Sequence, residues 1–148
     1  MSNQNWPFGH LNKDKCSLTA KHIAGSDLSK YGNEETIKEL KRYFLIRHIR
    51  KRRVTMESEI VDQSWHEFIL DTWNYTNFCE LAFGGYLHHH TDYYEPDMNF
   101  EVTYWELFGE SPHAMWDNSS SYSRQFFNLE RDNYNDQGPE DLSDQNCA

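Results

Sequence analysis

The chain has 148 residues, with 14 Lys and Arg against 24 Asp and Glu, which gives a formal net charge of −10. This length corresponds to one domain and suffices to bury a core without disulfide bonds. A mean hydropathy of −0.93 argues against a membrane-spanning helix. Three cysteines without a CxxC pair, and an N-terminus without a signal sequence, predict a cytoplasmic protein with reduced thiols.

The first 32 residues are predicted to form an irregular N-terminal arm that contains one short helix. Residues 1–16 include Pro7 and show no regular apolar period. Ser17 is a favourable N-cap residue for a short helix within residues 17–31.

A clear amphipathic helix follows the arm. Asn33 is a favourable N-cap residue, and Glu34 and Glu35 suit the positive end of the helix dipole. The helix ends in a basic cluster at residues 47–53, where cations stabilise a helix C-terminus. Its apolar residues recur at helical spacing: Ile37, Leu40, Phe44, Leu45 and Ile49.

The pattern next predicts one long central helix, which begins between Thr55 and Ser58 and ends at Gly84-Gly85. An apolar seam with alternating steps of four and three residues is expected to pack on another helix. The predicted structural residues are Trp65, Tyr75 and Cys79 of this seam, together with Gly84 and Gly85. The seam consists of Val61, Trp65, Phe68, Thr72, Tyr75, Cys79 and Ala82.

A last helix is expected after a histidine-rich turn, from Asp97 to about Phe108. The polar, acidic residues 117–148 offer little to bury, so we expect a largely disordered tail. The predicted fold is all-α. It is a small helical bundle over residues 33–116 with one long central helix, an irregular arm over residues 1–32 and the acidic tail.

Three motifs stand out in the second half of the chain: VDQSWHEFILDT at residues 61–72, FGGYLHH at residues 83–89 and YWELFGESP at residues 104–112. With Tyr75 and Cys79, they resemble a small bacterial-type member of the glycine-rich-domain-containing-protein-like family, over about residues 35–116. The resemblance implies a helical fold and no particular reaction. The sequence departs from the family pattern at Phe68, where many relatives have His, and at His90-Thr91, which separate the histidine pair from the usual Pro.

The polar stripe beside the seam contains a candidate metal site. Asp62 and His66 lie four residues apart on one helix face, and a carboxylate beside an imidazole orients its ring. Such a pair serves a metal ion, a general base or a structural hydrogen bond, and for the pair alone the structural reading is favoured. A site for Zn or Fe is expected to combine His66, His88 and either His89 or His90, with Asp62 as ligand or support and Cys79 or Asp92 as a fourth ligand.

The length of the central helix opposes this metal site. The end of the helix lies 18 residues beyond His66, about 27 Å along a straight helix at roughly 1.5 Å per residue. A shared site therefore requires a break, for which Asp71-Thr72 or Asn74 are candidates, or a ligand from a second chain. Otherwise, the corner at residues 88–90 is a solvated turn whose side chains cap exposed carbonyls.

Charge is distributed unevenly along the chain, with a balance of +7 over residues 1–53 and −17 over residues 54–148. The basic cluster at residues 47–53 suits the chain's own acidic half or an acidic partner, so nucleic-acid binding is disfavoured. No GxSxG, phosphate-binding loop or HExxH motif occurs. We expect an intracellular protein-interaction module with a protein partner and no membrane. The alternatives are a metal-binding protein or metalloenzyme using His66 and residues 88–90, and an acidic mimic of nucleic acid.

Overall fold

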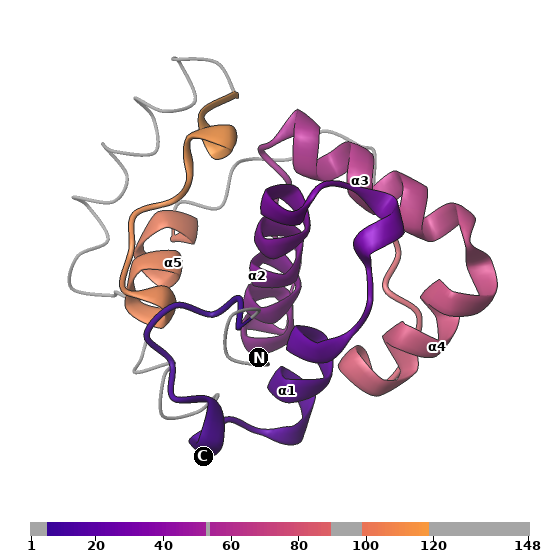
Figure 1. Ribbon diagram of the computed structural model, residues 1–148, viewed down its shortest axis with the longest axis horizontal. Helices are drawn as coiled ribbons and strands as arrows, with labels where there is room; N and C mark the ends of the chain where they lie inside the picture. Colours follow the sequence, from indigo (N-terminus) through magenta and orange to yellow (C-terminus); the bar gives the residue numbers. More distant parts are fainter. Residues whose placement is uncertain (1–5, 53, 90–98, 119–148) are drawn as a thin grey trace.

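The computed structural model describes residues 6–52, 54–89 and 99–118 (Figure 1). Its α-helices are α1 (Leu18–Gly25), α2 (Glu34–Arg50), α3 (Glu59–Leu70), α4 (Thr72–Phe83) and α5 (Phe100–Phe108). Short 3-10 helices are η2 (Lys13–Lys15), η3 (Ser29–Tyr31) and η4 (Ala114–Asn118). These ranges contain no strand, so the predicted all-α fold is confirmed. None of these helices is long and apolar enough to cross a membrane.

Helix α2 organises the bundle. It lies in the middle of the molecule, with α5 on one side and α3 and α4 on the other (Figure 1). It contacts α1, α3 and α5, while α4 packs against α1 and α3. The remaining helices therefore surround α2, and they place the residues after α4 close to α3.

Side-chain caps explain where the first helices begin. Ser17 accepts a hydrogen bond from the amide of Ala20 at 3.1 Å, and Asn33 accepts one from Thr36 at 2.8 Å. Both predicted N-caps are confirmed. Ser58 caps α3 in the same way, so the central helical region begins at the later of the two predicted positions.

The predicted central helix is not continuous: the chain bends at Asp71 between α3 and α4, one of the two positions at which the sequence allowed a break. Asp71 has φ −86° and ψ 74°, which is not helical. Its carboxylate accepts hydrogen bonds from Tyr31 Oη at 2.6 Å and Asn74 Nδ2 at 2.9 Å, and Lys30 Nζ lies 3.1 Å away. These three partners, in that order, lower the pKa of Asp71 to about 2. The ionised side chain therefore holds the bend against η3.

The seam predicted for a single helix continues around this bend. Trp65 and Phe68 of α3 are buried, and so are Tyr75 and Cys79 of α4. Thr72, at the bend, is exposed. Both helices therefore turn the same apolar face to the core, although their axes differ.

The core is aromatic and includes the N-terminal residues. Phe44 of α2 is fully buried, and its ring lies 5.1 to 6.4 Å from those of Trp65, Phe68, Phe78 and Phe83. Residues from the first 32 positions join the same cluster: Phe8, Leu11, Cys16, Ala20, Ile23, Leu28 and Tyr31. The arm therefore contributes to the core of the bundle through these residues.

A buried polar network joins α2 to α5 and η4. Glu39 and Arg42 are 1% and 2% exposed. Tyr104 Oη donates to Glu39 Oε1 at 2.7 Å and accepts from Arg42 Nη1 at 2.7 Å, and Trp116 Nε1 donates to Glu39 Oε1 at 2.9 Å. Helix α5 ends at Phe108, as predicted, whereas its expected cap Asp97 lies outside the described residues. The predicted tail lies outside them from residue 119 onward.

Candidate metal centre

Helix α3 carries two of the predicted site residues at the margin of the core. Trp65 is 3% exposed, and its ring packs against Tyr43 and Phe44, with centroids 5.3 and 5.8 Å away. This packing fixes the rotation of α3 about its axis. The adjacent positions 62 and 66 therefore lie at the surface, where the side chains of Asp62 and His66 are 30% and 51% exposed. Asp62 Oδ2 and His66 Nε2 are 3.4 Å apart.

The segment after α4 brings a third residue to this margin. Gly84 ends α4 with a left-handed φ of 74°, which glycine adopts at little steric cost. The predicted helix stop at this glycine is confirmed. Leu87 is buried, and its carbonyl accepts a hydrogen bond from Tyr75 Oη at 2.6 Å. Tyr75 Oη also accepts from Trp65 Nε1 at 3.0 Å, so the segment is tied to the helix that bears the other two residues.

His89 completes the cluster. Its side chain is 13% exposed, and its ring lies 4.2 Å from the ring of Trp65. His89 Nε2 is 2.6 Å from Asp62 Oδ1 and 3.1 Å from His66 Nε2. One donor atom from each of the three residues lies within 4.8 Å of both others. Residues 23 and 27 positions apart in the chain thus meet at one point.

The chemistry of this cluster depends on which ring nitrogen of each histidine carries the proton. A neutral imidazole carries its proton on one nitrogen and a lone pair on the other. With the proton on Nε2, His89 donates a charge-assisted hydrogen bond to Asp62. With the proton on Nδ1, the Nε2 lone pairs of His66 and His89 are directed at the Asp62 carboxylate, His66 near Oδ2 and His89 near Oδ1. The arrangement then offers two nitrogen ligands and one oxygen ligand to a cation.

The other predicted ligands are placed elsewhere. His88 is exposed, and its ring packs against Tyr86 at 4.7 Å. Cys79 is fully buried, and burial raises the pKa of its thiol, which favours the inert, protonated form. His90 and Asp92 lie outside the described residues. Of the predicted set, the structure therefore brings together His66, His89 and Asp62.

The bend at Asp71 resolves the distance problem posed by a straight helix. Because α4 packs back against α1 and α3, the 18 residues between His66 and Gly84 do not separate the two histidines along one axis. The required break falls at the first of the two predicted positions. No ligand from a second chain is needed to bring His66 and His89 within 3.1 Å.

Comparison with known proteins identifies a family by its sequence model. The model of the UCP032817-like family matches residues 8–95, which is more than half of the chain and includes Asp62, His66 and His89. The expected membership of the glycine-rich-domain-containing-protein-like family is therefore wrong. No curated protein matches the chain, and no solved structure matches it.

Proposed function

Because this chain belongs to the UCP032817-like family, whose description states no activity, we propose its function from the geometry of the site. The protein binds one divalent transition-metal ion, Zn²⁺ or Fe²⁺, through Asp62, His66 and His89. The observation that supports this most directly is the convergence of their three donor atoms from two separate segments.

Two imidazoles and one carboxylate form a ligand set that suits both ions. Catalytic zinc sites use three protein ligands and leave a position for water or substrate, and the same set on one face of an octahedron serves non-haem Fe(II). The side chain of His66 is 51% exposed, so an ion bound to it would be accessible from solvent. A bound ion supplies Lewis acidity there and lowers the pKa of a coordinated water.

Metal binding requires one oxygen of Asp62 to approach both imidazoles, which now face different oxygens of its carboxylate. Bonds of about 2.0–2.1 Å place two tetrahedral ligand atoms about 3.3 Å apart. The distance of 3.1 Å between His66 Nε2 and His89 Nε2, and that of 3.4 Å between His66 Nε2 and Asp62 Oδ2, are close to this value. The His89–Asp62 distance of 2.6 Å is that of a hydrogen bond, and it must lengthen by about 0.7 Å. Asp62 and His66 can rotate to provide this, because both are partly exposed.

The test uses untagged protein and a matched pair of neighbouring histidines. We expect elemental analysis to find one ion per chain after metal loading and desalting, and Co²⁺ to give visible d–d absorption bands. His89→Ala should lower Zn²⁺ affinity by more than the roughly 10–100-fold cost of losing a second-shell partner. His88→Ala should leave the affinity unchanged, because that ring lies against Tyr86.

Two outcomes would contradict this assignment. If the wild type holds no stoichiometric ion, the cluster is a hydrogen-bonded clamp between α3 and the segment after α4. If His88→Ala weakens binding as much as His89→Ala, a metal is bound by other residues.

The interaction-module and acidic-mimic hypotheses stay predictions, together with the cytoplasmic location. The two hypotheses on function rest on the uneven charge, with a balance of −17 over residues 54–148, and the location rests on the cysteines and the N-terminal sequence. Metal binding is preferred because its three donor atoms define a specific point in the structure, whereas the charge balance defines no particular partner.

A further inference from the structure

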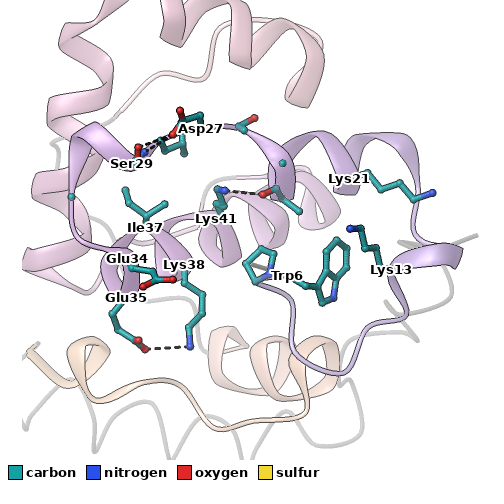
Figure 2. Close-up of a pocket in the computed structure, with 16 residues that line it drawn as sticks. Trp6, Lys13, Lys21, Asp27, Ser29, Glu34, Glu35, Ile37, Lys38 and Lys41 are labelled. Atoms are coloured by element: carbon teal, nitrogen blue, oxygen red, sulfur yellow. Dashed lines mark hydrogen bonds and ion pairs between the residues drawn. The ribbon is translucent and has the colours of Figure 1, made fainter. Parts of the chain in front are cut away.

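A hollow lies apart from the metal cluster, between the N-terminal segment, the end of α1 and the first half of α2 (Figure 2). Trp6, Pro7 and Lys13 line one side, and Ile37 and Lys41 of α2 line another. The residues of the metal cluster are not among those that line it. A ligand bound here is therefore distinct from the ion proposed above.

Lys41 is the most informative residue of this hollow. It is half-buried, and in Figure 2 it lies between Ile37 and Trp6. Its Nζ donates to the carbonyl of Ala24 at 2.7 Å. Within the described residues, no carboxylate oxygen forms an ion pair with it, although an ammonium has three donors. Burial lowers the pKa of Lys41, and the charge of Asp27 only partly opposes this.

Besides Lys41, the charged residues that line the hollow are three lysines and three acidic residues: Lys13, Lys21, Lys38, Asp27, Glu34 and Glu35. Lys13 lies over the Trp6 ring at 5.9 Å, and Lys21 is exposed. Two of the three acidic side chains, those of Asp27 and Glu35, have partners within the protein. Asp27 accepts hydrogen bonds from the amide and hydroxyl of Ser29, and Glu35 is 3.2 Å from Lys38. With Lys41, the lining holds four lysines and three carboxylates, and Lys41 is a half-buried cation among them.

Trp6 supplies an apolar wall that is held in place. Its Nε1 donates to the carbonyl of Leu11 at 3.0 Å, and its ring meets that of Phe8 edge-on at 5.2 Å. Phe8 is fully buried, so the indole is anchored to the core. We propose that this hollow binds a small organic anion whose acidic group pairs with the Lys41 ammonium and whose apolar body packs beside Trp6.

The chemistry is tested with four defined probes in titrations followed by NMR. Phenyl phosphate and benzoate carry an acid on an aromatic body, benzamide is neutral, and inorganic phosphate has no body. We expect at least one aromatic anion to shift resonances of the hollow and to bind about tenfold or more tightly than benzamide. The relative affinity of the first two probes tells a phosphate site from a carboxylate site. Equal binding of benzamide, or no binding of either aromatic anion, overturns the proposal, and equally tight inorganic phosphate overturns the role of Trp6.

Two further measurements locate the site. Lys41→Met should lower the affinity for the anion about tenfold or more. Lys15→Met should leave the affinity unchanged, because Lys15 is an exposed lysine that does not line the hollow. In the wild type, acetic anhydride labelling read by mass spectrometry should show Lys41 protected by the bound anion and Lys15 unprotected. Unchanged labelling of Lys41 at saturating anion overturns the assignment even if the Lys41→Met protein does not fold.

Discussion

Tyr75 positions the three proposed metal ligands without being one of them. Its hydroxyl accepts from Trp65 Nε1 and donates to the carbonyl of Leu87, so one oxygen connects α3, α4 and the segment that carries His89. The residue is fully buried. Its role as a structural residue was predictable from the apolar seam, but its two hydrogen bonds were not, because periodicity carries no information about Leu87.

Tyr75→Phe is expected to lower the free energy of unfolding by about 1–3 kcal/mol. The change leaves the Leu87 carbonyl and the Trp65 Nε1–H without their partner in the core. It should also weaken metal binding, because His89 loses the anchor two residues before it. Urea denaturation and a Zn²⁺ titration measure the two effects. Tyr86→Phe is the control, since Tyr86 is 43% exposed, and an equal loss in both variants would contradict this role.

At the scale of elements, the bend between α3 and α4 determines whether a site exists. The sequence pattern predicted the helical residues, the seam and the final glycine, and it named Asp71 as one candidate for a break. It could not decide between a rod and a bend, because both helices show the same apolar period on each side of Thr72. The deciding contact is the hydrogen bond from Tyr31, which lies 40 residues from Asp71 in the chain.

Stability should depend on the ionisation of Asp71. Its pKa is lowered from 3.8 to about 2, so the ionised form is favoured in the folded state. The resulting stabilisation is present above the ordinary pKa and is lost as the pH falls from about 4 towards 2. Asp71→Asn should therefore be less stable than the wild type at neutral pH, and the difference should shrink on acidification.

Denaturation curves over this pH range measure the effect of Asp71. Glu67→Gln serves as a matched control, because Glu67 is an exposed carboxylate on α3, the helix that ends just before Asp71. A difference between Asp71→Asn and the wild type that stays constant with pH would show that the carboxylate charge does not hold the bend.

At the scale of the whole molecule, α5 and η4 extend the bundle beyond the region that the family model matches. The match ends at residue 95, whereas α5 begins at Phe100. The two parts are joined by Glu39 and Arg42, which lie on α2 within the matched region and bind Tyr104 on α5. Composition gave no sign of this network, because charged residues on an amphipathic helix are expected to face solvent.

Tyr104→Phe should cost about 1–3 kcal/mol of unfolding free energy, or more. It removes a donor to the buried Glu39 carboxylate and an acceptor for Arg42. Thermal and urea unfolding measure the loss. Trp105→Phe is the comparison, because Trp105 is 59% exposed on the same helix and should change stability by less than about 0.5 kcal/mol. A neutral Tyr104→Phe would mean that the network does not hold α5 in place.

Two of the proposed ligands, Asp62 and His66, precede the Asp71 bend in the chain, and His89 follows it. Metal binding is therefore coupled to the folding equilibrium. An ion held by Asp62 and His89 closes a loop of chain in the native state, and the unfolded chain has no such preformed site. Mass action then makes the melting temperature follow the free concentration of the ion. At 100 times the dissociation constant, the gain is about 2.7 kcal/mol. A higher concentration of the free ion is therefore expected to raise the folded fraction of this protein.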